Sequence, residues 1–459
     1  MQPAVIKKYL PPFKARLYLP GDKSISHRAV FIASLAEGKT LAKNFLFSDD
    51  SLATVDAFRK LGVKIVTDVK RRQAAIYAKG LRGLIKPKGP IYVRESGTTM
   101  RLLCGVLAGQ KFSSLLAGAK TLTSRPMRRI LIPLRLMGAE IKSKIKDQKS
   151  KTPEEYPPLR IKGQNLKAIA YRMPVASAQV KSAIMFAALY ADGKTKIVEQ
   201  IRSRDHSERM LRLFGASIAT QGLKISIKKS NLISPGIVNI PSDISSAAFF
   251  MVLAALHDDS DVLLKSIGIN PTRRGLIDVL MRMGADIYVK PAVLPKAGVK
   301  AAAEPIADIR VKAKSLKGVT IKEKDIPGMI DELPVLMVAA SLAGGRTIIN
   351  GVSELRVKET DRINSMVSNL KKMGAKINFR SKTGAKTKEY IEITGVDELK
   401  GARVKSFGDH RTAMSMVVAG LLAKGQTHID DVGCIDKSFP EFMPIVKNAF
   451  GRCVISSRD

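Results

Sequence analysis

The sequence has little of what several common protein classes require. Its 459 residues contain no Trp and 5% aromatic residues, so a surface for stacking nucleic-acid bases has few side chains to be built from. Cys104, Cys434 and Cys453 are too few and too far apart for a disulfide framework or a zinc site. The longest clean apolar run, residues 247–256, is about half of what a bilayer span needs. No apolar core of a secretory signal follows Met1, so we expect a cytoplasmic protein.

Acidic residues are also scarce, since 40 Asp and Glu stand against 78 Lys and Arg and the formal net charge is +38. A basic surface is one mark of a nucleic-acid-binding protein, and this is one interpretation of the composition. The basic residues are spread along the chain without a basic tail, and anionic small-molecule substrates explain the balance equally well. The 45% hydrophobic and 26% charged fractions are typical of a globular protein, and the length allows about two to three domains.

A short phrase recurs through the whole chain, as LGVKI, MGAEI, FGASI, MGADI, MGAKI and, in degraded form, FGRCVI. Its glycines stand at positions 62, 138, 215, 284, 374 and 451, and a second phrase of the type EGKTL or GGRTII interleaves with it. Apolar residues at helical spacing precede each glycine and β-branched residues follow, which predicts a helix that ends on a left-handed glycine before a strand. A Gly turn before a strand is expected at the second phrase. Six such units indicate two lobes of three units each.

Charged residues gather at the predicted helix starts of these units. Ser, Thr, Asp and Gly are ordinary caps there, whereas the helix dipole disfavours cations. The cations at these starts are Lys23, Arg28, Arg125, Arg204, Lys358, Arg362, Arg411 and Lys437. Free N–H groups at helix starts bind anions, and Lys or Arg side chains complete a phosphate or carboxylate site. The pattern therefore predicts a cleft for polyanionic substrates.

Two carboxylates at these starts, Asp331 and Glu359, are expected to be the acids available for proton transfer. The charge run ELRVKETDRI at 354–363 contains one of them, and we interpret it as a helix start rather than a solvated helix face. His27, His206 and His410 lack the spacing of metal ligands, so they are expected to pack or to form hydrogen bonds.

The motifs GDKSISHRA, SGTTMRLL, SRPM, ASAQVKSA, RVKETDR and GDHR occur in this order, and with them the sequence resembles the 5-enolpyruvylshikimate-3-phosphate synthases over nearly its whole length. The resemblance implies an α/β fold (α+β in some schemes), a two-lobed inside-out α/β barrel or β/α prism of six βαβαββ repeats. Residues 21–240 would form the N-terminal lobe, residues 1–20 plus 241–459 the C-terminal lobe, and the active site would lie in the cleft between them. Residues 143–158 and about 289–307 fall outside the resemblance and are expected to be surface excursions.

The resemblance also implies a reaction. The enolpyruvyl group of phosphoenolpyruvate moves to the 5-hydroxyl of shikimate 3-phosphate, through a tetrahedral intermediate and with release of phosphate, in the biosynthesis of chorismate and the aromatic amino acids. No metal and no organic cofactor takes part. The partners would be these two substrates, without specific nucleic acid or membrane, and we expect a monomer that is a target of glyphosate.

Residue roles follow from the motifs by the same resemblance. Shikimate 3-phosphate would be bound by Lys23, Ser24, Arg28, Ser177, Ala178, Gln179, Arg204, Asp331 and Lys358. Phosphoenolpyruvate would be bound by Lys23, Gly97, Arg125, Gln179, Arg362, Arg411 and Lys437. Asp331 would take the proton of the 5-hydroxyl, Glu359 would shuttle the proton at the methylene carbon, and Lys23 completes the catalytic set. The chain departs from common family residues at Glu95, Ala178 and Glu354.

Two alternatives remain open at this point. A UDP-N-acetylglucosamine enolpyruvyl transferase shares the fold, but it uses a loop Cys near the position where this chain reads LAGAKTLTSRP, without Cys. The motif SGTTMR does not fit it either. A basic nucleic-acid-binding protein is the alternative from another class, and it rests on the net charge alone.

Overall fold

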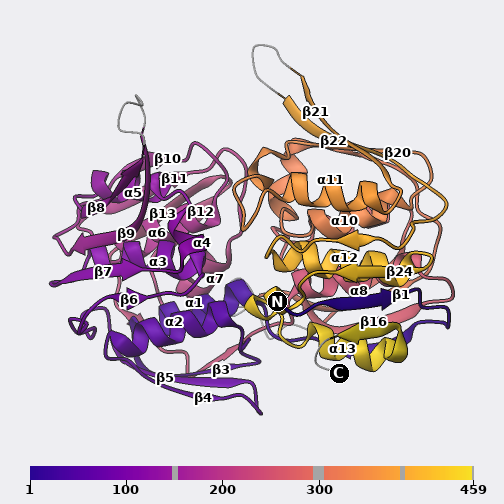
Figure 1. Cartoon of the computed structure of the whole chain (residues 1–459). Helices are drawn as coiled ribbons and strands as arrows, with labels where there is room; N and C mark the ends of the chain where they lie inside the picture. The colour runs from indigo at the N-terminus through magenta and orange to yellow at the C-terminus, as the bar shows by residue number, and fades with distance from the viewer. Residues whose placement is uncertain (147–152, 293–303, 383–387, 457–459) are drawn as a thin grey trace. The chain divides into compact units, whose positions relative to one another are not determined.

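The computed structural model describes residues 1–146, 153–292, 304–382 and 388–456, and these divide into two compact units (Figure 1). The N-terminal unit comprises the described residues of Gly21–Ile240 and Leu294–Glu304. The C-terminal unit comprises those of Met1–Pro20, Pro241–Val293 and Pro305–Asp459. The described residues form six sheets, three in each unit, which confirms the predicted six-unit α/β fold.

The sheets of the N-terminal unit have the strand orders β14-β3-β5-β4 (with β15 also on β3), β6-β7-β9-β8 and β10-β11-β13-β12. The strands are β3 (Ala36–Lys43), β4 (Lys64–Asp68), β5 (Gln73–Lys79), β6 (Ile91–Tyr92), β7 (Ser113–Ala117), β8 (Glu140–Lys146), β9 (Glu154–Lys162), β10 (Ala170–Arg172), β11 (Lys194–Val198), β12 (Ile218–Gln221), β13 (Lys224–Lys228), β14 (Leu232–Ile233) and β15 (Ile237–Asn239). The helices are α1 (Lys23–Ala33), α2 (Asp49–Lys60), α3 (Gly97–Ala108), α4 (Lys120–Thr123), α5 (Arg128–Leu136), α6 (Ala178–Ala188) and α7 (His206–Leu213).

The sheets of the C-terminal unit have the orders β17-β18-β16-β2, β19-β20-β22-β21 and β23-β24-β1-β25. The strands are β1 (Ala4–Lys7), β2 (Lys14–Tyr18), β16 (Asp261–Gly268), β17 (Asp286–Pro291), β18 (Ile306–Lys312), β19 (Thr320–Ile321), β20 (Arg346–Asn350), β21 (Lys376–Lys382), β22 (Lys388–Thr394), β23 (Arg403–Val404), β24 (Gln426–Ile429) and β25 (Val454–Ser456). The helices are α8 (Ile244–Leu256), α9 (Gly275–Arg282), α10 (Leu333–Ser341), α11 (Arg362–Lys372), α12 (His410–Leu422) and α13 (Phe442–Phe450), with 3-10 turns η1 (Glu323–Gly328), η2 (Ser353–Leu355), η3 (Gly433–Lys437) and η4 (Gly451–Cys453). The indigo strand β1 pairs with β24 near the other end of the chain (Figure 1).

Each repeat joins a parallel strand pair to an antiparallel hairpin. In the second repeat, β6 runs parallel to β7 across helix α3, and β7 then pairs with the β8–β9 hairpin that follows α5. The strands alternate buried and exposed residues, as Lys194 and Lys196 alternate with the buried Thr195 and Ile197 in β11. This pattern is typical of a sheet with one face on the core and one in water. The exposed faces thereby carry part of the large excess of lysine.

A central helix of each repeat is buried in the core of its unit. Every residue of α3 except Thr98 is buried, and α8 and α10 are apolar on all sides. Helices α3 and α6 pack backbone to backbone, since a Cβ added at Gly105 would lie 2.1 Å from the Ala183 carbonyl oxygen. Within the described residues, no helix is both long and apolar enough to cross a membrane.

Five of the six repeated glycines end the second helix of their repeats directly before a strand, as predicted, whereas Gly451 ends α13 and leads into the 3-10 turn η4. Gly62, Gly138, Gly215, Gly284 and Gly374 follow α2, α5, α7, α9 and α11 with φ between 85 and 97°. A residue without a Cβ adopts this left-handed conformation at no steric cost, which lets the chain turn directly into the next strand. The second phrase differs in the first repeat, because β3 begins at Ala36 and Gly38 therefore lies inside the strand rather than before it.

Strands occupy most of the described residues in the two segments expected to be surface excursions, so a loop over 143–158 is wrong there. Tyr156 pairs with Lys144, so that β8 and β9 continue as a hairpin through much of 143–158. Strands β17 and β18 likewise take up both ends of 289–307. Backbone pairing with the neighbouring strand determines the conformation here. Residues 147–152 and 293–303 lie outside the described residues.

Candidate functional site

Helix α1 presents the first predicted cation. Asp22 caps the helix, because its Oδ1 accepts a hydrogen bond from the Ile25 N–H at 2.9 Å. Lys23 is the first helical residue, and its Nζ lies 3.0 Å from Oδ2 of Asp50 in the first turn of α2. Both side chains are less than one-fifth exposed. A carboxylate from the neighbouring helix start therefore holds an ammonium group at a position that the helix dipole disfavours.

Arg28 follows at the inner face of the same helix and is buried. Its Nε donates to Ser207 Oγ at 2.7 Å, its Nη2 to Ser182 Oγ at 3.0 Å, and its Nη1 to the Ser24 carbonyl at 3.0 Å. Burial lowers the pKa of Arg28 to about 10, and the nearby carboxylate of Glu208 opposes this shift. Within the described part of the chain, no carboxylate lies at ion-pairing distance from Arg28. A buried guanidinium held by neutral oxygens is suited to bind an anion.

Helices α3 and α6 meet at the predicted residues Gly97 and Gln179. The Arg101 side chain donates from Nη1 to Gln179 Oε1 at 3.1 Å, and Gln179 Nε2 donates to Thr98 Oγ1 at 3.1 Å. A Cβ added at Gly97 would lie 2.6 Å from Arg101 Nη1 and 3.0 Å from Arg125 Nη1. Glycine therefore lets two guanidinium groups approach the start of α3.

The remaining predicted residues of the N-terminal unit lie at the starts of α6 and α7. Ser177 caps α6 by accepting from the Val180 N–H at 3.4 Å, and Ala178 is the first helical residue. Arg204 lies two residues before α7. Its charge is close enough to lower the pKa of Arg28 further. The N-terminal unit thus brings Arg28 and Arg204 together.

Arg362 is the centre of the site in the C-terminal unit. Its guanidinium, 2% exposed, donates from Nε to Asp409 Oδ2 at 2.8 Å, from Nη1 to Asp331 Oδ1 at 3.2 Å and from Nη2 to Glu359 Oε2 at 2.6 Å. Burial by itself lowers the pKa of Arg362, but these carboxylates reverse the effect and raise the pKa above its ordinary value. The two predicted proton-transfer groups therefore share one arginine.

Asp409 links this cluster to the start of α12. Its Oδ1 accepts from the backbone N–H groups of Arg411 at 2.7 Å and Thr412 at 3.1 Å, while its Oδ2 accepts from Arg362. The Lys437 ammonium donates to the Gly408 carbonyl at 3.3 Å. The structure thus gathers the predicted cations Arg362, Arg411 and Lys437 around one loop.

The charge run at 354–363 divides into two parts. Arg356 pairs with Asp361 at 2.9 Å and with Glu389 at 3.3 Å, at the outside of the unit. Arg362 turns inward as the first residue of α11, and its neighbour Glu359 points to it. The half-buried Lys358 lies in the same loop. The prediction of a helix start is confirmed.

Sequence reasoning missed several partners of these side chains. Asp331 and Glu359 are not the only carboxylates at these helix starts, because Asp50 and Asp409 also pair there with predicted cations, and the role of the first two in proton transfer stays a prediction. Ser182, Ser207 and Arg101 were also not predicted, although they lie inside or beside the quoted motifs. The fold brings these side chains close to Arg28 and Gln179, and their positions in the sequence do not reveal these contacts. The quoted motifs were therefore the available indication that residues near them belong to the site.

The three histidines pack or form hydrogen bonds, as predicted, and His410 is buried. His27 Nδ1 lies 2.6 Å from Thr54 Oγ1, and His206 Nδ1 lies 2.7 Å from Glu304 Oε1. Burial lowers the pKa of His27 well below its ordinary value, with help from the charges of Lys23 and Arg28. Across the described residues, no group of three or more His, Cys, Asp or Glu side chains is arranged to hold a metal ion.

Known proteins match this chain over almost its full length. The model of the family described as EPSP synthase (3-phosphoshikimate 1-carboxyvinyltransferase) matches residues 10–446. Relatives named 3-phosphoshikimate 1-carboxyvinyltransferase include one from Citrifermentans bemidjiense, 45% identical over 96% of this chain and 97% of its own. Another, from Nitrosococcus oceani, is 46% identical over 95% of this chain and 93% of its own. A solved EPSP synthase from Acinetobacter baumannii superimposes with a TM-score of 0.84 at 42% identity and covers 100% of both chains.

Proposed function

This chain belongs to the EPSP synthase family, and we propose from that membership that it transfers the enolpyruvyl group of phosphoenolpyruvate to the 5-hydroxyl of shikimate 3-phosphate. The products are 5-enolpyruvylshikimate 3-phosphate and phosphate. Membership in this family disfavours a UDP-N-acetylglucosamine enolpyruvyl transferase. The scarcity of aromatic residues disfavours a nucleic-acid-binding protein.

The observation that carries the substrate assignment is the environment of Arg28. A buried guanidinium bound to hydroxyl and carbonyl oxygens keeps its charge available for an anion. We assign to shikimate 3-phosphate the residues Lys23, Ser24, Arg28, Ser177, Ala178, Gln179, Arg204, Asp331 and Lys358. The free N–H groups at the start of α6 support this assignment, since helix starts bind phosphate and carboxylate groups.

Phosphoenolpyruvate is assigned to a second set of cations. These are Lys23, Arg125, Arg362, Arg411 and Lys437, together with Gly97 and Gln179. Gly97 supports the assignment because its missing side chain leaves the Arg125 guanidinium close to the start of α3. Several cations near one phosphate stabilise the charge that develops as phosphate leaves.

The proton transfers are assigned to the carboxylates on Arg362. Asp331 takes the proton of the 5-hydroxyl as its oxygen attacks C2 of phosphoenolpyruvate, and Glu359 delivers a proton to C3. In the second step Glu359 takes a proton back from the C3 methyl group as phosphate leaves C2. Hydrogen bonds of 3.2 and 2.6 Å to one guanidinium support this assignment, because they fix both carboxylates against the arginine that we assign to phosphoenolpyruvate.

A phosphate-release assay tests the proposed function. Purified protein with both substrates should release phosphate and form the enolpyruvyl ether in equal amounts, and either substrate alone should give neither product. Phosphate release that does not require shikimate 3-phosphate would contradict the proposal.

We propose further that the protein acts as a cytoplasmic monomer and that glyphosate competes with phosphoenolpyruvate. Size-exclusion chromatography with light scattering tests the monomer, and a mass of two chains would contradict it. A salt titration of DNA binding tests the nucleic-acid alternative, because a specific complex retains appreciable affinity at physiological salt.

A further inference from the structure

A buried cluster of charged side chains lies directly behind the hydroxyl groups that hold Arg28. Lys181 of α6 is 1% exposed, and its Nζ lies 2.7 Å from Glu208 Oε1 and 3.0 Å from Glu199 Oε2. The same ammonium donates to the Ser203 carbonyl at 3.3 Å. Both glutamates are 3% exposed. Burying such charges costs desolvation energy, and an apolar group of similar volume would often be equally stable, so stability alone does not account for the cluster.

The Lys181–Glu208 ion pair lies next to the pair of serines that binds Arg28. Lys181 is followed by Ser182, and Ser207 is followed by Glu208. The hydroxyls of Ser182 and Ser207 lie 2.7 Å apart, and both accept hydrogen bonds from Arg28. The ion pair and the hydroxyl pair therefore cross-link α6 to α7 at neighbouring positions. Displacement of Lys181 from Glu208 would move the two hydroxyls and the guanidinium they hold.

The other glutamate extends the cluster to Arg204. Glu199 Oε1 accepts from the backbone N–H of Ser203 at 3.1 Å and also from the Ser203 hydroxyl. Residue 203 immediately precedes Arg204, so Lys181 and Glu199 fix the turn that carries this arginine. Lys181 thereby contacts Glu208, which follows the Ser207 that binds Arg28, and the backbone of Ser203, which precedes Arg204.

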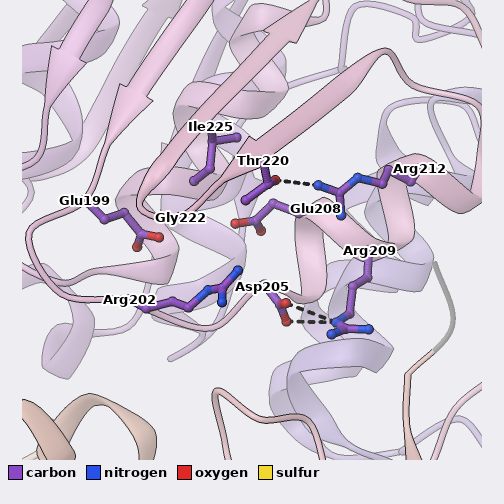
Figure 2. Close-up of a pocket in the computed structure, with 9 residues that line it drawn as sticks. All are labelled: Glu199, Arg202, Asp205, Glu208, Arg209, Arg212, Thr220, Gly222 and Ile225. Atoms are coloured by element: carbon purple, nitrogen blue, oxygen red, sulfur yellow. Dashed lines mark hydrogen bonds and ion pairs between the residues drawn. The ribbon is translucent and has the colours of Figure 1, made fainter. Parts of the chain in front are cut away.

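Glu199 and Glu208 are among the residues that line a cavity of about 220 Å³, and Figure 2 shows both together with the other lining residues. Arg209 is paired there with Asp205 at 3.1 Å. Oε2 of Glu208 has no hydrogen-bond partner among the described residues. The Lys181 ammonium lies at ion-pairing distance from Oε1 of the same carboxylate, so it helps to determine where the Glu208 side chain lies.

We propose that Lys181 is a positioning residue for shikimate 3-phosphate, which holds Arg28 and Arg204 in place through Glu208 and Glu199 without contacting the substrate. The inference rests on the proposed function, because it assumes that these two arginines bind shikimate 3-phosphate. Among the described residues, those assigned to phosphoenolpyruvate alone form no hydrogen bond or ion pair with Lys181, Glu199 or Glu208. Loss of Lys181 should therefore act selectively on one of the two substrates.

The test is the steady-state kinetics of Lys181→Met and Lys181→Arg with each substrate varied in turn. Loss of one charged hydrogen bond to the substrate lowers affinity by about tenfold or more, so we expect Lys181→Met, which displaces Arg28 and Arg204, to raise KM for shikimate 3-phosphate by at least about tenfold. KM for phosphoenolpyruvate should change by less than about twofold, because its own residues stay in place. Lys181→Arg keeps the charge and should restore part of the affinity. Equal changes in the two KM values, or no change in either, would overturn the proposal.

Two further variants separate positioning from loss of stability. Leu189→Ala, at the other end of α6, removes a fully buried side chain, and it should lower Tm while leaving the ratio of the two KM values unchanged. Lys181→Met combined with Glu208→Gln removes one of the two carboxylate charges that Lys181→Met leaves without the ammonium group. This double variant provides the kinetic measurement if Lys181→Met alone does not fold. A wild-type KM for shikimate 3-phosphate in this double variant would also overturn the proposal. Wild-type turnover in the same assay tests the proposed function separately.

Discussion

Replacement of Arg362 tests the buried charge cluster of the C-terminal unit. In Arg362→Met, the carboxylates of Asp331, Glu359 and Asp409 lose the guanidinium they share. Asp409 is 0% exposed, whereas Asp331 and Glu359 are 19% and 29% exposed and can be solvated in part. The free-energy change should therefore arise mainly from Asp409, whose Oδ2 would be left buried beside an apolar side chain.

The magnitude follows from the cost of a buried charge without its partner. Removing one member of such a pair destabilises a protein by about 3–5 kcal/mol. A domain of the size of the C-terminal unit loses about 2–4 °C in Tm for each kcal/mol, so we expect a decrease of about 6–20 °C. Arg362→Lys retains a positive charge but not the planar guanidinium with its several donors. Because a charged hydrogen bond contributes about 1.5–3 kcal/mol, the Tm of Arg362→Lys should lie between those of wild type and Arg362→Met.

Differential scanning calorimetry of the three proteins at neutral pH measures this effect. Arg346→Met is a matched control, because Arg346 pairs with Glu392 at 3.0 Å in the same unit but is 63% exposed. An exposed pair contributes at most about 1 kcal/mol, so the control should unfold close to wild type. If Arg362→Met unfolds as the control does, Arg362 does not stabilise the buried carboxylate and the reasoning is refuted.

The other predictions concern single side chains. Because the folded pKa of His27 is lowered, the unfolded chain takes up a proton near pH 6.5 that the folded chain does not, and stability is lost as pH falls below that value. Tm of His27→Gln should thus decrease less than that of wild type between neutral and acidic pH, and parallel curves would contradict this. Asp331→Asn and Glu359→Gln should each lower kcat by about 10²–10⁴ in the phosphate-release assay, and near-wild-type turnover removes that residue from the mechanism. In Gly97→Ala the added methyl group would press on the guanidinium groups of Arg101 and Arg125, a cost of typically about 1–3 kcal/mol. The inhibition constant for glyphosate should rise more than KM for phosphoenolpyruvate, and an equal rise would contradict the expectation.

Local rules predicted much of the fold from the sequence. The glycine at position 374 ends α11 and turns the chain into β21 because a left-handed residue is needed there, and this requirement is visible in a few neighbouring residues. The start of α11 at Arg362 was predicted in the same way. The extent of the β8–β9 hairpin was not predicted, because strand pairing across a turn depends on partners that the composition of the segment does not reveal.

The side-chain partners within the site were harder to predict for a related reason. Ser182 and Ser207 are 25 residues apart, and in the sequence each is indistinguishable from an ordinary serine near a helix start. Asp409 was recognised as part of a motif, but its second role as the partner of Arg362 depends on a contact across 47 residues. Such contacts arise from the packing of helices whose relative positions the sequence pattern does not determine.

The central claim is that this chain joins phosphoenolpyruvate to shikimate 3-phosphate, and a single-turnover reaction followed by ³¹P NMR tests it most directly. Enzyme in excess over both substrates should convert the phosphoenolpyruvate signal into inorganic phosphate while the 3-phosphate signal shifts to that of the enolpyruvyl ether. Omission of shikimate 3-phosphate should leave phosphoenolpyruvate unchanged. A spectrum in which both substrates persist, or in which phosphate forms while the 3-phosphate signal stays in place, would contradict the account.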